Sequence, residues 1–303
     1  MSGLRPFALH RPDTLDEAID LLEQHGDEAM IYAGGTELLI LLKAGLVRPR
    51  RLVDVKRLPR LREVAEAGDD LVIGATVAHR DVERSAAVRR RCPLVAEVAR
   101  HVANVRVRNV GTVGGNLAFA DPHSDLATLF LIFDATVELR GRSGARALAL
   151  GDFIQGPYET ARADGQILTA VRLHAWPAGT AGAYVKYGVY ERPTLGVAAA
   201  LFPAASGRPA ELRLAAGCIG PRPQRLGRTE AAARGLDPRT IGERADELAA
   251  LAAVEVDPMS DLHGSAEYKR EMTRVFVRRA LAVAAGRAQG AEAHARYAHT
   301  VVV

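Results

Sequence analysis

The sequence predicts an α+β protein made of three consecutive folding units. The chain has 303 residues, which is longer than most single hydrophobic cores. Proline, glycine and charged residues interrupt the apolar patterns at residues 56–59 and again at Trp176 and Pro177, and such interruptions are typical of unit boundaries. After the interruption at Trp176 and Pro177, strand-like segments are followed by helix-like segments, as in α+β folds. The predicted units are therefore 1–57, 58–177 and 178–290, and residues 291–303 are predicted to be a tail.

The composition is that of an ordinary globular protein. Hydrophobic residues make up 48% of the chain and charged residues 25%, which excludes a disordered protein. Lys and Arg together number 40 against 36 for Asp and Glu, and the surplus is scattered among acidic residues, so nucleic acid is not expected as a partner. The start of the chain lacks the apolar run of a secretion signal, and no later apolar run reaches the length of a membrane span. We therefore expect a cytoplasmic protein.

Cysteine usage limits the redox chemistry of this chain. The only two cysteines, Cys92 and Cys218, lie far apart and neither has a partner at metal-ligand spacing. A disulfide framework, a zinc site and an iron–sulfur cluster held by this chain alone are therefore not expected. Any redox metal should be carried by another chain.

The first unit is predicted from its capping and turn residues. Thr14, with Glu17 three residues later, forms a capping box for an amphipathic helix that Gly26 ends. An apolar strand at 29–32 runs directly into the turn Ala33-Gly34-Gly35-Thr36-Glu37. Such a junction of strand, glycine turn and helix suits a phosphate, although two glycines in this position are more often only a tight connection. The other expected elements here are strands at 7–9 and 52–55 and a helix at 38–43 that stops at Gly45.

The remaining elements follow from apolar periodicity. In the second unit we expect a hairpin of strands 64–67 and 71–77, helices at 93–102 and 126–133, strands at 136–139, 147–150 and 167–173, and a helix or turn at 152–158. In the third unit we expect strands at 184–187, 196–202 and 212–218, then helices at 228–234, 240–254 and 265–287.

The stretch at residues 108–125 is predicted to be a ligand loop. Gly111, Gly114 and Gly115 remove three side chains within five residues, so the backbone can take positive φ values and approach a ligand closely. Side-chain hydrogen-bonding groups flank these bare amides. Their residues are Thr112, Asn116, Ser124 and Asp125. Glycine spacing this dense would not fill a core, so a reason other than packing is expected.

Together, the turn at Gly34 and Gly35 and the loop at 112–116 form two glycine-rich cradles in adjoining units. Backbone amides of this kind can neutralise an extended dianion without lysine, and the pyrophosphate of a dinucleotide fits that description. The spacing matches neither the Gly-x-Gly-x-x-Gly fingerprint of a Rossmann site nor a P-loop.

Three separated motifs resemble a known family. They are Ala33-Gly34-Gly35-Thr36-Glu37-Leu38-Leu39, then Arg108-Asn109-Val110-Gly111-Thr112-Val113-Gly114-Gly115-Asn116 with Asp125, and finally Asp261-Leu262-His263-Gly264-Ser265-Ala266-Glu267-Tyr268-Lys269-Arg270 with Arg278-Arg279-Ala280-Leu281. In this order they resemble the FAD-binding subunits of molybdenum hydroxylases, a group that includes the medium subunit of aerobic carbon monoxide dehydrogenase and the flavin part of xanthine dehydrogenase. The resemblance spans nearly the whole chain. It implies a two-part PCMH-type FAD-binding region followed by a C-terminal α+β domain of the CO dehydrogenase flavoprotein type.

The resemblance also implies which residues hold FAD. The turn, the loop and two later positions contribute them. They are Tyr32, Ala33, Gly34, Gly35, Thr36, Glu37, Gly111, Thr112, Gly114, Gly115, Asn116, Asp125, Leu168 and Lys186. Other interpretations remain open: Asp125 and Thr36 can be helix caps, Glu37 suits the first turn of a helix, and Lys186 can be an exposed strand lysine. No catalytic residue and no metal ligand is expected in this chain.

By resemblance, the chain is an electron-transfer flavoprotein subunit. Substrate would be oxidised at a molybdopterin-bound molybdenum in a large partner, and electrons would pass through 2Fe-2S clusters in a small partner to FAD in this chain and then to an acceptor. A heterotrimer or its dimer is expected. The alternatives are a stand-alone FAD-dependent oxidase or reductase and a scaffold that has lost flavin.

Two details depart from this pattern or add to it. Glu191-Arg192-Pro193-Thr194 stands where the family commonly has Arg-Arg and then Asp, which leaves the outer edge of the flavin and the electron acceptor open. Among the histidines, His123 alone lies in the predicted ligand loop. It is expected either to touch the cofactor or to be a surface imidazole.

Overall fold

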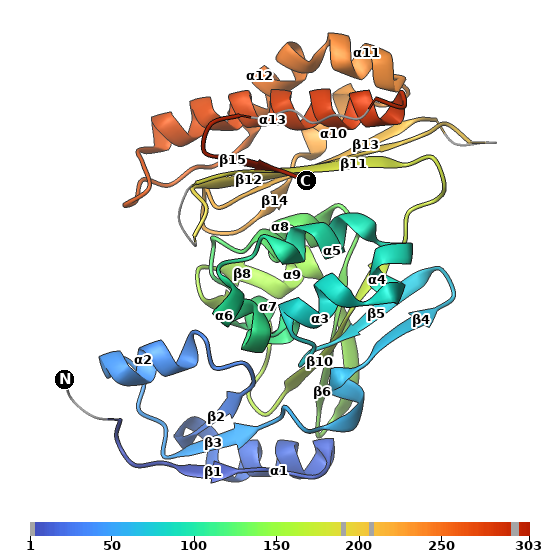
Figure 1. Ribbon diagram of the computed structural model, residues 1–303. Coiled ribbons are helices and arrows are strands. Elements are labelled where there is room, and N and C mark those ends of the chain that lie inside the picture. Colours follow the sequence, from blue (N-terminus) through green and yellow to red (C-terminus); the bar gives the residue numbers. More distant parts are fainter. Residues whose placement is uncertain (1–3, 189–191, 206–208, 292–296) are drawn as a thin grey trace.

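The computed structural model describes residues 4–188, 192–205, 209–291 and 297–303. Its elements form three larger sheets and one two-stranded sheet. The three larger sheets are stacked one above another in Figure 1, with the N-terminal unit at the bottom and the C-terminal unit at the top. Each of the three larger sheets is built from one continuous stretch of the chain, while the division into units stays a prediction. The exact boundaries at 57–58 and 177–178 stay predictions.

The N-terminal unit is a three-stranded parallel sheet in the order β1-β3-β2. Its first helix begins as predicted, because the Thr14 hydroxyl accepts a hydrogen bond from the Glu17 amide and Gly26 caps the other end. Gly45 ends the second helix in the left-handed conformation. The elements are β1 (Ala8–His10), α1 (Leu15–His25), the 3₁₀ turn Gly26–Glu28, β2 (Ala29–Tyr32), α2 (Leu38–Ala44), β3 (Arg51–Asp54) and the 3₁₀ turn Pro59–Arg62.

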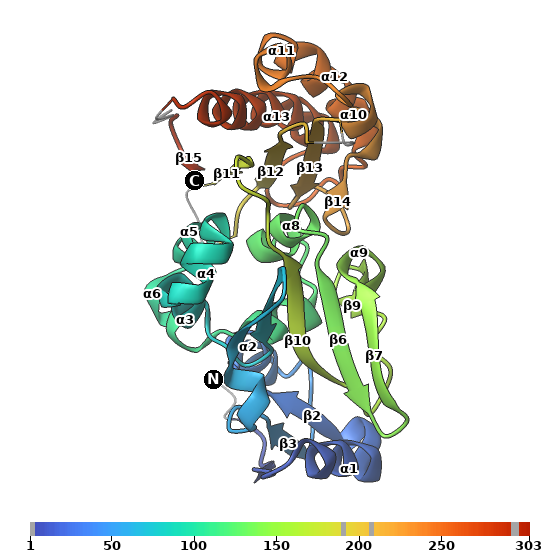
Figure 2. The ribbon, with the colours of Figure 1, turned by 90° about the vertical axis from the view of Figure 1, so that its right-hand side faces the viewer.

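The middle unit is an antiparallel five-stranded sheet in the order β4-β5-β10-β6-β7. Its strands β10, β6 and β7 lie side by side in Figure 2. Its helices and the sheet share one large apolar core. The strands are β4 (Val64–Ala67), β5 (Asp70–Gly74), β6 (Thr136–Gly141), β7 (Gly144–Ala149), β10 (Ile167–His174) and a separate pair, β8 (Ile154–Gly156) and β9 (Glu159–Thr160). The helices are α3 (His79–Arg84), α4 (Ala86–Arg91), α5 (Pro93–Arg100), α6 (Val105–Val110), α7 (Val113–Phe119), α8 (Asp125–Leu131) and α9 (Leu150–Phe153).

The C-terminal unit is a five-stranded sheet covered by helices on one face. Successive residues of a strand point to opposite faces, and here both faces are buried. Ala198 and Ala200 join the core of the middle unit, whereas Val197 and Ala199 join the core beneath the helices. The elements are β11 (Ala181–Tyr187), β12 (Leu195–Phe202), β13 (Glu211–Gly217), β14 (Gln224–Arg225), α10 (Gly227–Ala232), α11 (Pro238–Glu243), α12 (Ala245–Glu255), α13 (Ala266–Ala288) and β15 (Thr300–Val302).

Two expectations for the C-terminal unit are wrong. The helix predicted at 240–254 is two helices, α11 and α12, with a break at Arg244. The tail predicted at 291–303 is not a tail at residues 300–302, because β15 pairs with the edge of β11 and Val303 exchanges two backbone hydrogen bonds with Tyr184. The apolar end of the chain thus supplies a strand that the exposed edge of β11 requires. Residues 292–296 lie outside the described residues.

In the described ranges of the chain, no helix combines the length and the apolar character that crossing a bilayer requires. The cytoplasmic location stays a prediction.

Candidate functional site

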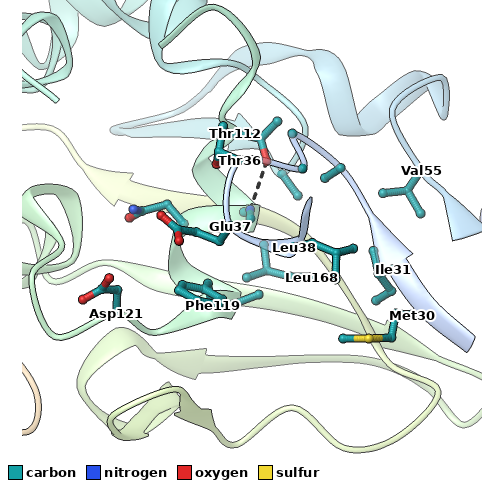
Figure 3. Close-up of a pocket in the computed structure, with 18 of the residues that line it drawn as sticks. Met30, Ile31, Thr36, Glu37, Leu38, Val55, Thr112, Phe119, Asp121 and Leu168 are labelled. Atoms are coloured by element: carbon teal, nitrogen blue, oxygen red, sulfur yellow. Dashed lines mark hydrogen bonds between the residues drawn. The ribbon is translucent and has the colours of Figure 1, made fainter. Parts of the chain in front are cut away.

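A cavity of about 690 Å³ lies where the three units meet, a size typical of small-molecule and cofactor sites. The turn after β2 lines it from the N-terminal unit, α7 and β10 line it from the middle unit, and Arg192 reaches it from the C-terminal unit. Figure 3 shows Glu37, Phe119 and Asp121 towards one side of the cavity, and Met30, Ile31, Leu38, Val55 and Leu168 towards the other. The cavity therefore has an acidic part and an apolar part.

The two glycine-rich segments touch each other at the wall of this cavity. A Cβ on Gly34 would lie 2.4 Å from the carbonyl oxygen of Val110 and 2.8 Å from the Cα of Gly111, so only glycine allows the turn to approach the end of α6. The next residue, Gly35, has a φ of +73°, which side chains rarely tolerate. The glycine turn after β2 and the end of α6, which the sequence predicts to adjoin one ligand, are thus in direct backbone contact.

The stretch at 108–125, predicted to be a ligand loop, is mostly helical, so the loop conformation is wrong and the ligand stays a prediction. It contains the end of α6, all of α7 and the start of α8. Thr112 caps α7, because its hydroxyl accepts a 3.1 Å hydrogen bond from the Gly115 amide. None of its glycines, Gly111, Gly114 and Gly115, has a positive φ. Close packing explains at least one of them instead, since a Cβ on Gly114 would lie 2.5 Å from the Cβ of Ala75.

Most of the residues predicted to hold the cofactor line the cavity, and three do not. Tyr32 packs beside Gly35 and under the Lys56 ammonium, which lies 3.6 Å from its ring centre. Gly111 separates Gly34 from the buried ring of His79. Lys186 is the third. The predicted residues that line the cavity are Ala33, Gly34, Gly35, Thr36, Glu37, Thr112, Gly114, Gly115, Asn116, Asp125 and Leu168.

Lys186 lies behind the cavity wall and does not line the cavity itself. It is only 5% exposed, so the interpretation as an exposed strand lysine is wrong. Its ammonium donates to Asp125 at 2.7 Å and to the backbone oxygen of His101 at 2.8 Å. The Tyr184 hydroxyl donates to the other Asp125 oxygen at 2.9 Å. One cavity carboxylate is therefore held by two side chains of β11.

The alternative in which Asp125 caps α8 is also wrong. Ser124 is the cap, and its hydroxyl accepts from the Ala127 amide. The same Ser124 hydroxyl donates to the side-chain oxygen of Asn116 at 2.6 Å. This bond fixes the Asn116 side chain at the cavity wall.

The sequence does not reveal an ionic cluster at the acidic part of the cavity. Arg192 lies 3.2 Å from both Glu37 and Asp121, and thereby joins all three units. Burial raises the pKa of Glu37, and Arg192 opposes this. Burial also disfavours ionisation of Asp121, but hydrogen bonds from the His123 ring and backbone hold its pKa below the usual value. In the sequence, only the departure of residues 191–194 from the family pattern drew attention to the segment that contains Arg192.

His123 lines the cavity and is not a surface imidazole. Its ring lies 3.0 Å from Asp121 and 3.6 Å from Asp261, the residue that also receives the buried ammonium of Lys269. Among the described residues, no three His, Cys, Asp or Glu side chains gather in a way that could hold a metal ion.

His79 is a second cavity residue whose position the sequence does not reveal. It is 3% exposed, and its Nδ1 has no hydrogen-bond partner among the described residues. Burial, reinforced by the charge of Arg108, lowers the pKa of His79 to about 4. The imidazole is therefore neutral at physiological pH.

This burial predicts acid sensitivity. We expect the protein to lose about 3 kcal/mol of stability as the pH falls from 6.5 to 4, because the unfolded histidine binds a proton in this interval and the folded one does not. The stability is fully present above pH 6.5. Urea unfolding of the wild type and of His79→Gln at several pH values measures it. The variant should show a flatter pH dependence than the wild type, whereas His299→Gln, at an exposed side chain, should not. Equal slopes for His79→Gln and the wild type would contradict the assignment.

The cavity suits a dinucleotide cofactor. Its wall contains glycine backbone at 34–35 and 114–115, polar groups at Thr36, Asn116 and Asp125, and an apolar part around Leu168. Bare backbone can approach a pyrophosphate, and an apolar part can accept a ring. The described residues thus fit FAD.

Comparison with known proteins agrees with this fit. Residues 5–176 match the family described as the FAD binding domain in molybdopterin dehydrogenase, and residues 191–284 match the CO dehydrogenase flavoprotein C-terminal domain. The chain is 34% identical to the carbon monoxide dehydrogenase medium chain of Hydrogenophaga pseudoflava, over 91% of this chain and 96% of the relative. It is 31% identical to the xanthine dehydrogenase FAD-binding subunit of Escherichia coli O157:H7, over 92% and 98%.

Solved structures are equally similar. Carbon monoxide dehydrogenase from H. pseudoflava superposes with a TM-score of 0.88 at 33% identity, over 94% of this chain and 99% of that chain. Quinoline 2-oxidoreductase from Pseudomonas putida 86 gives 0.85 at 29% identity, over 95% and 99%. The protein is an oxidoreductase subunit that belongs to the FAD-binding medium subunits of the molybdenum hydroxylases.

Proposed function

We propose that this chain holds FAD in the cavity between its three units and passes electrons from iron–sulfur clusters of a small partner to an external acceptor. The substrate would be oxidised at molybdenum in a large partner. The observation that carries the proposal is the glycine-lined cavity with one acidic and one apolar part. FAD supplies the redox chemistry when bound, and the protein positions and tunes it.

Each part of the cavity wall has a distinct task in this proposal. The backbone of residues 33–36 and 112–115 borders the pyrophosphate, since both segments line the cavity. Asn116 and Asp125 bind hydroxyl groups of the chain that links the pyrophosphate to the flavin. Lys186 and Tyr184 keep the Asp125 carboxylate in place by the bonds described above. Lys186 is thus a positioning residue, and Leu168 and its apolar neighbours pack against a ring of the cofactor.

The partners follow from the names of the relatives. The similar chains are called medium chain or medium subunit in carbon monoxide dehydrogenase and in the nicotine 6-hydroxylase of Paenarthrobacter nicotinovorans. We infer that this chain likewise assembles with a large molybdenum-bearing chain and a small iron–sulfur chain, as a heterotrimer or its dimer. Cytoplasmic assembly is part of this proposal.

The test is to purify the chain from its native host through an N-terminal tag and to measure its spectrum and metal content. We expect a yellow preparation that releases FAD, with molybdenum, iron and two further chains. A chain that stays colourless after FAD is added would contradict flavin binding and favour a scaffold. A yellow chain that comes alone and turns over a substrate by itself would favour a stand-alone flavin oxidase or reductase.

A further inference from the structure

Asp261 brings a charge of the C-terminal unit to the cofactor cavity. It lies in the loop before α13, within the third motif of the sequence, and its carboxylate is firmly held. The ammonium of Lys269, only 1% exposed, donates to one oxygen at 2.6 Å, and the His263 amide donates to the other at 2.8 Å. The oxygen that receives Lys269 also lies 3.6 Å from Nε2 of His123, which lines the cavity. The C-terminal unit thus presents a fixed carboxylate to a histidine of the cavity wall.

His123 stands between this carboxylate and that of Asp121. Its Nδ1 lies 3.0 Å from Asp121, and its Nε2 is buried without a hydrogen-bond partner among the described residues. A neutral imidazole has a proton on only one of its nitrogens. That proton belongs on Nδ1, because the Asp121 carboxylate can only accept, and the lone pair of Nε2 then faces Asp261. A second proton on Nε2 replaces this repulsion by an ion pair.

The two carboxylates stay ionised in the pH range where histidine titrates. Despite its burial, Asp121 has a pKa below the usual value because of the hydrogen bonds described above. Burial disfavours ionisation of Asp261 as well, but the Lys269 ammonium and the His263 amide hold its pKa below the usual value. Histidine ordinarily changes its charge between about pH 5 and about pH 8. In this interval the contact with Asp261 therefore depends on whether His123 binds a second proton.

The charged groups around His123 form a series of alternating sign that runs from the N-terminal unit to α13. An imidazolium completes this series, whereas a neutral ring leaves two carboxylates facing each other across it. A further titratable group, His263, lies against the ring, with the ring centres 4.9 Å apart. A proton on His263 would repel the imidazolium, so this neighbour needs its own control. The members of the series are Glu37, Arg192, Asp121, His123, Asp261 and Lys269.

We infer that His123 is a positioning residue whose protonation fastens the cavity wall to the C-terminal unit, so that FAD is retained more firmly at acidic than at alkaline pH. Two effects act in the same direction. The imidazolium ties Asp121 to Asp261 and so holds the segment 121–125, most of which lines the cavity. It also adds a positive charge to the acidic part of the wall, which favours an anionic cofactor. The inference rests on the proposed function and adds its pH dependence.

The experiment follows the release of FAD from the tagged protein purified from its native host. The protein is diluted into flavin-free buffers between about pH 5 and about pH 8, and flavin fluorescence records the release rate. His123→Gln removes the titratable group, and His123→Lys supplies a charge that is permanent in this interval. His263→Gln is the matched control, because this histidine touches the same ring but does not line the cavity. Urea unfolding checks that each variant is folded.

We expect the wild type to release FAD about tenfold faster at the alkaline end of this interval than at the acidic end, since a partly buried contact of a charged histidine is worth a factor of this size. His123→Gln should release FAD at the fast rate throughout, and His123→Lys at the slow rate throughout. His263→Gln should keep the pH profile of the wild type. The burial of His79 weakens the protein at acidic pH, so it cannot imitate the expected slowing of release.

A wild-type rate without pH dependence would overturn the inference, as would a His123→Gln variant that keeps the dependence. Loss of the dependence in His263→Gln would assign the proton to that residue and overturn it equally. So would a folded His123→Lys variant that releases FAD as fast as His123→Gln, because the charge would then have no effect. In each of these outcomes the protein still binds FAD and the proposed function stands. A protein that stays colourless after FAD is added would overturn the proposed function, and this inference with it.

Discussion

Replacing Lys186 with methionine is expected to destabilise the protein by about 3–5 kcal/mol, the usual cost of removing one partner of a buried ion pair. The side chains of Lys186 and Asp125 are 6% and 4% exposed. Without the ammonium, the Asp125 carboxylate keeps only the Tyr184 hydroxyl as a side-chain donor among the described residues. FAD retention should fall as well, because Asp125 lines the cavity. Urea unfolding and flavin absorbance measure the two effects.

Two further variants separate the ion pair from general damage to the core. Lys43→Met removes an exposed lysine and should change the stability of the isolated chain by no more than about 0.5 kcal/mol. The double variant Lys186→Met, Asp125→Asn removes both charges and should recover much of the lost stability, since replacing both members of a buried pair is often close to neutral. A single Lys186→Met variant as stable as the wild type, or a double variant less stable than the single one, would contradict the buried pair.

Local sequence signals predicted much of the fold. Caps at Thr14, Gly26 and Gly45 place helix ends where the structure has them, because a cap is an interaction between residues a few positions apart. The period of apolar residues predicted most strands and the longer helices for the same reason, but it missed the short helices α3, α4, α6 and α7 and the strand β8. β15 escaped prediction, since its partner β11 lies more than a hundred residues earlier. Three valines without a turn signal do not reveal a distant sheet edge.

The candidate site shows the same division between local and distant causes. Glycine spacing singled out the turn at Gly34 and Gly35 and the start of α7, and both segments line one cavity. It predicted a positive φ at Gly114, whereas the structure has a close approach of Gly114 to Ala75. That approach depends on how the end of strand β5 packs, which lies about forty residues earlier in the chain. The inward position of Lys186 depends on Asp125, and that of Arg192 on Glu37 and Asp121. No pattern within either segment contains these partners.

Adding one methyl group at Gly34 tests the central contact of the site. The Cβ of Gly34→Ala would meet the Val110 oxygen at 2.4 Å and the Gly111 Cα at 2.8 Å. Both are backbone atoms, which cannot move aside as the end of a side chain can. The turn must therefore separate from α6, and such overpacking costs about 1–3 kcal/mol. We expect FAD to bind about tenfold or more weakly, since 1.4 kcal/mol corresponds to a factor of ten. Titration of the apoprotein with FAD, followed by flavin fluorescence, measures this.

The matched control for this substitution is Gly227→Ala. A Cβ there meets nothing within 4 Å, and the residue is the first of helix α10, where alanine is at least as favourable as glycine. Its FAD affinity should equal that of the wild type. If Gly34→Ala also bound FAD within about twofold of the wild type, a difference of about 0.4 kcal/mol, then the contact between the turn and α6 would not shape the cofactor site. The two glycine-rich segments would then share a cavity wall without depending on each other, and Gly34 would be a tight connection and nothing more.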